Sequence, residues 1–183
     1  IPAQLSAPGR LLRHIAQMRV TGPTAEDLLK VLKHPLCHSG AERGQHLLWT
    51  AELELFIRKR GVPYPSIDQF SEWKRFDEAE DWLAWMDAHV LRPAVDGEKP
   101  LADHIAQHLT QTEAICAGSV SEDASELWAK DAGKTCRKAF DTLIENAGFA
   151  GDMPIRDYAD LVDAILRAEE VRDRDAPHPH ILI

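Results

Sequence analysis

The sequence predicts an all-α fold, an irregular array of about seven to nine helices with a short orphan strand at the C-terminus. Apolar residues recur at helical spacing through most of the chain, and residues that start or stop helices separate these segments. Only residues 180–183 have the extended apolar pattern of a strand. A chain of 183 residues is long enough to bury a core as a single helical domain.

Two helices are predicted before residue 36. The first covers residues 8–20 and begins with Pro8, which a helix tolerates in its first turn. Thr24 and Asp27 have the spacing of a weakened capping box, which predicts the start of the second helix, and Pro35 ends it. The apolar side of the first helix consists of Leu11, Ile15 and Met18.

Residues 41–60 are predicted to form a long central helix. Their apolar side chains would point in nearly every direction around the helix, and a helix without a clear polar face is usually buried. Gly61 is expected to end it, because glycine often follows a helix C-terminus. The apolar residues are Leu47, Leu48, Trp49, Leu53, Leu55, Phe56 and Ile57.

Further helices are expected along the rest of the chain. Ser66 is expected to cap a short helix, and the acidic residues within 77–81 are expected in the first turn of a helix over 77–91. Residues 95–100 read as a turn-rich break, and glycines divide the remainder into helices, the last of them carrying Ile155. The strand at 180–183 has no partner strand elsewhere in the chain, so the natural polypeptide is expected to continue.

The formal net charge of −9 argues against a domain that holds DNA on its own, since phosphate neutralisation supplies most of such affinity. Two basic clusters remain as candidates for contact with DNA or a partner protein, although solvated helix ends and faces explain them more simply. The clusters are Arg58, Lys59 and Arg60, and Lys134, Arg137 and Lys138. Trp85, offset from the apolar side of its helix, is the candidate exposed anchor for a partner.

The three cysteines are odd in number and widely spaced, which predicts free thiols in a reducing cytoplasm. No apolar run approaches the roughly 20 residues of a membrane span, and no secretory signal is visible at the first residues. No membrane partner is therefore expected.

No convincing catalytic residue set appears in the sequence. Lys134 and Thr135 follow a glycine as in a phosphate-binding loop, but Trp128 occupies the position of the loop's first glycine. His104 and His108 have the spacing of metal ligands on a helix, but a third ligand is missing and Ile105 stands where a zinc protease has its glutamate. A stand-alone helical metal-binding protein or enzyme that uses these two histidines stays open as an alternative.

Two segments resemble the AddB family of alphaproteobacterial DNA-repair proteins. Residues 29–44 (LKVLKHPLCHSGAERG) are similar to a run of that family that precedes a helix rich in Leu, Glu and Arg, as residues 53–58 are here. Residues 169–183 are similar to the family's return into its helicase core. The two segments lie in the first third and the last tenth of the chain, and the middle matches nothing specific.

The resemblance implies a place in a larger protein. Residues 36–176 would be the helical insertion (2B) of a superfamily 1-like helicase, with 1–35 bordering the helicase core and 177–183 returning into it as a strand. AddB works with the AddA subunit as a helicase–nuclease that processes double-strand breaks for recombinational repair. The family's ATP, magnesium and iron–sulfur sites would lie outside this segment, so no catalytic, cofactor or metal residue is assigned in it. An adaptor of another complex is a further alternative.

Overall fold

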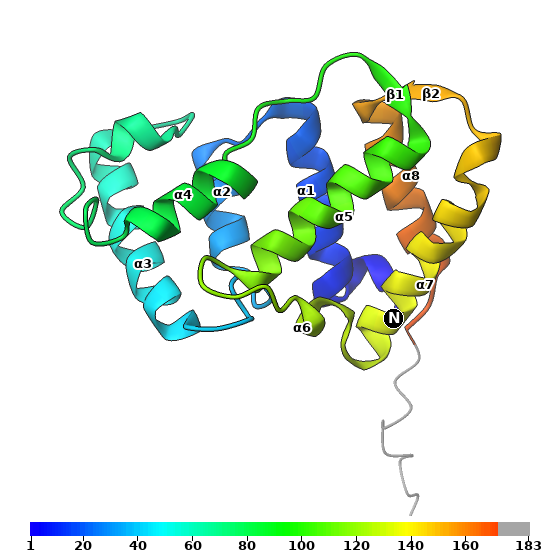
Figure 1. The fold of residues 1–183 in the computed structure, drawn as a ribbon, viewed down its shortest axis with the longest axis horizontal. Helices are drawn as coiled ribbons and strands as arrows, with labels where there is room; N and C mark the ends of the chain where they lie inside the picture. The colour runs from blue at the N-terminus through cyan, green and yellow to red at the C-terminus, as the bar shows by residue number, and fades with distance from the viewer. Residues whose placement is uncertain (172–183) are drawn as a thin grey trace, which may run out of the picture.

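The computed structural model describes residues 1–171, and these residues confirm the all-α prediction. Within residues 1–171, eight α-helices are connected by loops and three single-turn 3-10 helices (Figure 1). The α-helices are α1 (Ala7–Thr21), α2 (Ala25–Leu32), α3 (Arg43–Arg60), α4 (Glu80–His89), α5 (Leu101–Ala117), α6 (Ser125–Trp128), α7 (Lys130–Asn146) and α8 (Ile155–Ala168). The strand expected at 180–183 lies outside the described residues. None of the described helices is long and apolar enough to cross a membrane.

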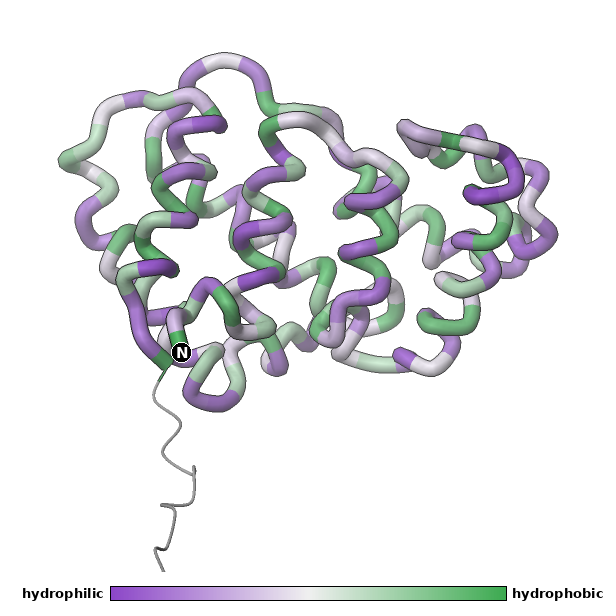
Figure 2. The backbone as a smooth tube through the Cα atoms, turned by 180° about the vertical axis from the view of Figure 1, so that it is seen from behind, coloured by the Kyte–Doolittle hydropathy of each residue, from purple (hydrophilic) through white to green (hydrophobic). Residues whose placement is uncertain are grey.

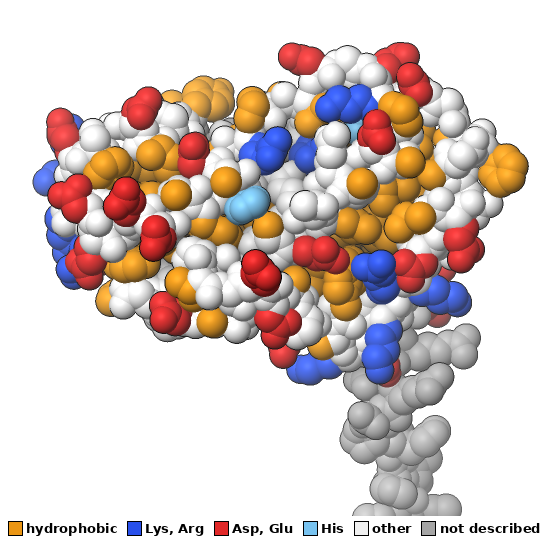
Figure 3. Space-filling model, viewed as in Figure 1, with side chains coloured by type: hydrophobic (Ala, Val, Ile, Leu, Met, Phe, Trp, Pro, Cys, Tyr) orange, Lys and Arg blue, Asp and Glu red, His pale blue; other side chains and the backbone are white. Residues whose placement is uncertain are grey.

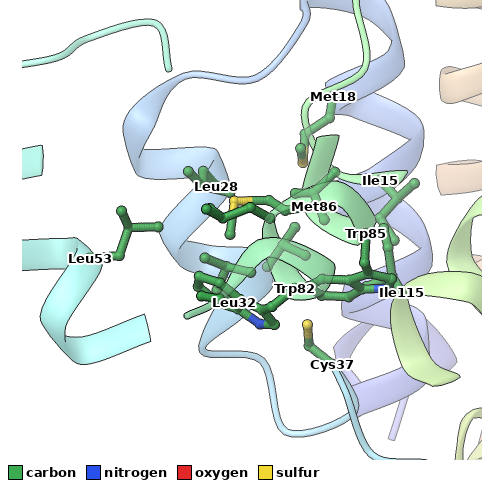
Figure 4. Close-up of a cluster of buried hydrophobic side chains, with 14 of the residues drawn as sticks. Ile15, Met18, Leu28, Leu32, Cys37, Leu53, Trp82, Trp85, Met86 and Ile115 are labelled. Atoms are coloured by element: carbon green, nitrogen blue, oxygen red, sulfur yellow. The ribbon is translucent and has the colours of Figure 1, made fainter. Parts of the chain in front are cut away.

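Helices α1 and α5 lie at the centre of the molecule, with α2, α3 and α4 to one side and α7 and α8 to the other (Figure 1). Helices α1 and α5 lie between two clusters of buried hydrophobic side chains. The first cluster lies among α1 to α4 and the end of α5, and Figure 4 shows Trp82, Trp85 and Met86 converging on it. The second lies among α1, α5, α7 and α8 and includes Phe140 and Tyr158.

Local capping explains where several helices begin and end. The Ser6 hydroxyl accepts a hydrogen bond from the Gly9 amide at 3.3 Å and so caps α1. The capping box expected at the start of α2 is confirmed, because Thr24 and Asp27 bond each other's backbone. Gly61 ends α3 in the left-handed conformation, with φ of 65°, as the sequence indicates.

The prediction of a central helix over 41–60 is wrong about its place. Helix α3 lies at one end of the molecule in Figure 1, and it buries only one side. Figure 2 shows hydrophobic and hydrophilic stretches alternating along the helices, but in α3 part of the hydrophobic set faces solvent. Apolar periodicity cannot distinguish a side chain buried in the domain from one left exposed on its surface.

Two other expectations need correction. Helix α4 begins at Glu80, so Asp77 and Glu78 lie in the preceding turns instead of the helix. Residues of the expected break and of a glycine-flanked linker pair as strands β1 (Glu98–Pro100) and β2 (Asp152–Pro154), antiparallel. These strands are short and have no alternating apolar pattern, and each directly precedes a helix, α5 or α8, that contacts the other.

Candidate interaction surface

The outward side of α3 carries a stripe of exposed apolar residues. Gly44, Leu48, Ala51 and Leu55 are four, three and four positions apart, which places them on one helix face, and all four are exposed. The side chains of Leu48 and Leu55 are 51% and 69% exposed, and Leu47 at the edge of the stripe is 42% exposed. We call these five residues the outer face of α3.

The opposite side of α3 holds the helix in place. Leu53 and Ile57 are buried in the first hydrophobic cluster, and Trp49 and Phe56 pack against it. Buried His46, near the start of the helix, hydrogen-bonds to the Leu32 carbonyl at the end of α2. The outer face therefore sits on a helix that is fixed from behind, so it is displayed as a preformed surface.

Exposed leucines gathered on one helix face point to a binding role. Single exposed apolar residues are common on any protein, but a contiguous group marks an interaction site. Full burial of one Leu side chain against a partner is worth about 1.5–3 kcal/mol. Gly44 and Ala51 lack bulk, so they allow a partner to approach the helix backbone closely.

The predicted basic cluster at residues 58–60 lies at the C-terminal end of this face. Arg58 is ion-paired with Glu54, and Arg60 pairs with Glu72 and lies over the ring of Phe56. Lys59 forms no ion pair with any residue from 1 to 171. Cations in the last turn also complement the helix dipole, so most of this charge is already balanced within the domain.

The second predicted cluster lies on α7, away from α3. Arg137 pairs with Asp141 at 2.9 Å and lies 5.2 Å from the centre of the Trp128 ring. Lys134 and Lys138 are exposed and make no ion pair with another described residue. The structure therefore does not bring the two basic clusters together into one patch.

The prediction of Trp85 as an exposed anchor is wrong. Its side chain is 6% exposed, and its indole nitrogen donates to the Ala114 carbonyl at 2.9 Å, which ties α4 to α5. The residue looks offset on a helical projection of its own helix alone. The end of α5 covers that side of α4, and such a long-range contact cannot be read from local spacing.

His104 and His108 are both buried between helices. His108 bonds to the Tyr158 hydroxyl at 2.7 Å and to the Leu12 carbonyl at 2.9 Å, so both of its ring nitrogens already have protein partners. His104 bonds to the Met153 carbonyl at 2.8 Å and stacks on Tyr158. Within residues 1–171, no three or more His, Cys, Asp or Glu side chains are grouped so that they could hold a metal ion.

One feature of the sequence is consistent with the outer face of α3. The absence of a polar side in residues 41–60 was the feature that indicated a central position, and the same feature fits a helix with one face in the core and another kept for a partner. Comparison with protein-family models, curated proteins and solved structures found no match. The fold and this surface define the class: a helical module that presents an apolar helix face.

Proposed function

We propose that this chain is a non-catalytic helical subdomain of an AddB-like subunit, inserted in a cytoplasmic helicase–nuclease that processes DNA double-strand breaks. In this role the outer face of α3 contacts the AddA-like partner subunit. DNA would be engaged through the parent complex. The resemblance of residues 29–44 and 169–183 to that family suggests this assignment.

The observation that carries the proposal is the pairing of residues 1–3 with residues 169–171. The backbone nitrogen of Ile1 donates to the Val171 carbonyl at 2.9 Å, and the Val171 amide donates back at 2.8 Å. The Ala3 amide donates to the Glu169 carbonyl at 2.8 Å. Residues 1–3 and 169–171 thus lie side by side, which is common in compact domains and is compatible with a helical unit inserted in a host domain.

The outer face of α3 supports a protein partner in preference to DNA. Its centre is apolar, and the basic residues at its end are largely paired with acidic ones. A DNA-contacting surface needs several free cations, because each neutralised phosphate releases counterions. A surface with an apolar centre and a charged edge is instead typical of protein interfaces.

The test is co-purification of the AddA-like subunit from the same cell with the parent protein, in three forms. The forms are the wild type, Leu48→Glu/Leu55→Glu on the outer face, and Val120→Glu/Ile144→Glu as the matched control. The control places the same two charges on apolar residues that are 52% and 45% exposed elsewhere. We expect the outer-face variant to lose the partner and the control to retain it. Equal retention by both variants would contradict the proposed contact.

A salt titration of single-stranded and duplex DNA binding separates partner contact from DNA contact. Each basic cluster is reversed in turn, Arg58→Glu/Lys59→Glu/Arg60→Glu and Lys134→Glu/Arg137→Glu/Lys138→Glu. We expect no salt-sensitive binding by the chain, in line with its net charge of −9. Binding that is lost only when residues 58–60 are reversed would place the end of α3 on the DNA and overturn its assignment to the partner.

The alternatives have their own decisive measurements. Stoichiometric zinc by elemental analysis, lost on changing His104 or His108, would favour the metal-binding protein. Capture of a different complex, with no AddA-like subunit present, would favour the adaptor.

A further inference from the structure

A pocket of about 280 Å³ lies between α1, the end of α4 and α5. Figure 3 shows Lys and Arg side chains and a His side chain gathered on this face, near the end of α4. Every charged residue in its lining is a cation or a histidine, and the rest are polar or small. The lining consists of Arg19, His89, Arg92, Ala106, Gln107, Thr110 and Gln111. Four other pockets of the described residues each have at least one Asp or Glu in their lining, and this one has none.

Arg19 forms the floor of the pocket and is 5% exposed. Its two terminal nitrogens donate to the side-chain oxygens of Gln111 and Gln107, at 2.9 and 3.0 Å. Its Nε is buried without a hydrogen-bond partner. An arginine keeps its proton inside proteins, and a buried charge normally has a counter-charge. Among residues 1–171, Arg19 forms no ion pair.

No carboxylate among residues 1–171 forms an ion pair with Arg19. Burial lowers the pKa of Arg19; among residues 1–171, Tyr158 opposes this shift and the Arg92 guanidinium adds to it. Gln111 is held in orientation by donating to the His89 carbonyl at 2.8 Å, so its oxygen is presented to Arg19. The two amide oxygens accept hydrogen bonds from Arg19, but they are neutral and do not balance its charge.

We propose that this pocket binds a phosphate-class oxyanion between Arg19 and Arg92. Guanidinium groups bind such anions through paired, charge-assisted hydrogen bonds. Exposed Arg92 forms no ion pair with another described residue and stands at the mouth. Thr110 and Gln107 also line the pocket, and both side chains carry neutral hydrogen-bond donors. The pocket shares no residue with the outer face of α3, so this proposal and the proposed function can fail separately.

The experiment measures binding of inorganic phosphate to the whole chain by calorimetry and by thermal unfolding, at neutral pH and constant ionic strength set with sodium chloride. The variants are Arg92→Gln, Arg19→Met, and Arg156→Gln as the matched control on the exposed side of α8. Arg92→Gln changes an exposed residue, so it tests the pocket without disturbing the core. Arg19→Met removes the floor charge while keeping a side chain of similar shape.

We expect phosphate to raise the melting temperature more than chloride does, because a ligand that binds only the folded state stabilises it. The dissociation constant should rise about tenfold or more in Arg92→Gln and binding should vanish in Arg19→Met, with Arg156→Gln unchanged. No phosphate binding by the wild type would overturn the proposal, as would an equal loss in Arg92→Gln and Arg156→Gln.

A single-stranded oligonucleotide added to the phosphate-bound protein distinguishes the two sources of the anion. Displacement of phosphate by the oligonucleotide, sensitive to Arg92→Gln, identifies a backbone phosphate of nucleic acid. Phosphate that stays bound in its presence identifies a free phosphate or a small phosphorylated molecule.

Discussion

The indole nitrogen of Trp82 donates a hydrogen bond to Nδ1 of His46 over 3.0 Å. Nδ1 must therefore be unprotonated, and the proton of the neutral ring sits on Nε2, which donates to the Leu32 carbonyl at 2.7 Å. One ring thus connects α2, α3 and α4, and it stacks on His38 at 4.7 Å between ring centres. A protonated His46 would face the indole donor with a second N–H, so the packing requires the neutral form.

The stability of the protein should fall as the pH drops below about 6.5. Burial lowers the pKa of His46 to about 4, and burial together with Arg19 lowers the pKa of His108 to about 3. Between the folded pKa values and pH 6.5, these histidines are protonated in the unfolded chain but not in the folded chain. Their contribution to the unfolding free energy is therefore complete above about pH 6.5 and decreases as the pH falls towards the folded pKa values. Each of these two histidines should lower the unfolding free energy by about 2 kcal/mol between pH 6.5 and pH 5. Urea denaturation across this range checks the slope, and a flat profile from pH 7 to pH 5 would refute it.

Substituting two glycines by alanine should have opposite effects. A Cβ on Gly9 would lie 2.0 Å from the Ala3 carbonyl oxygen, so Gly9→Ala forces α1 away from the preceding turn. We expect a loss of about 1–3 kcal/mol or more. Gly44 in the first turn of α3 has open space around it, and Gly44→Ala should stabilise by up to about 1 kcal/mol. Thermal unfolding of the two variants side by side tests the sign of each effect.

Two leucines of α3 should respond differently to the same truncation. Leu53 is fully buried in the first hydrophobic cluster, and Leu53→Ala should cost about 2–5 kcal/mol. Leu55 is 69% exposed, and Leu55→Ala should change the unfolding free energy by less than about 0.5 kcal/mol. A large cost at Leu55, measured by urea denaturation, would mean that the outer face is already covered in the free protein.

The thiols should react only when the protein unfolds. All three cysteines are buried and free, and burial raises the pKa of Cys116 to about 12, that of Cys136 to about 11, and that of Cys37 well above its usual range. Since the thiolate is the reactive form, a disulfide reagent at mildly alkaline pH should modify the folded protein slowly. Its rate should follow the urea unfolding curve. Rapid modification of one thiol in native buffer would show that its burial is incomplete.

The sequence predicted helix caps and helix ends, but it did not predict which helices contact one another. The Thr24–Asp27 capping box and the Gly61 stop depend on residues within one turn of each other, so pattern alone identifies them. The burial of Trp85 depends on the contact between α4 and α5, which the sequence pattern does not show. The strands β1 and β2 pair although they lie about fifty residues apart in the chain.

The candidate surfaces follow the same division. Arg58, Lys59 and Arg60 were visible as a run of cations, but their pairing with Glu54 and Glu72 depends on side-chain geometry. Arg19 gave no sign of a binding role, since a lone arginine near a helix end is common. Only the fold reveals that no carboxylate of residues 1–171 forms an ion pair with it.

Helices α1 and α5 each contribute side chains to both hydrophobic clusters. In α1, Ile15 belongs to the first and Leu12 to the second, and in α5, Ile115 and Ile105 are divided in the same way. Because α1 and α5 pack into both clusters, unfolding of one cluster would expose buried residues of the other. The parts of the domain around the two clusters should therefore unfold as a single cooperative unit. Helix α3 contributes buried residues, Leu53 and Ile57, to the first cluster alone, so its local opening would uncover that cluster but not the second. The element that displays the outer face is therefore coupled directly to only one half of the core.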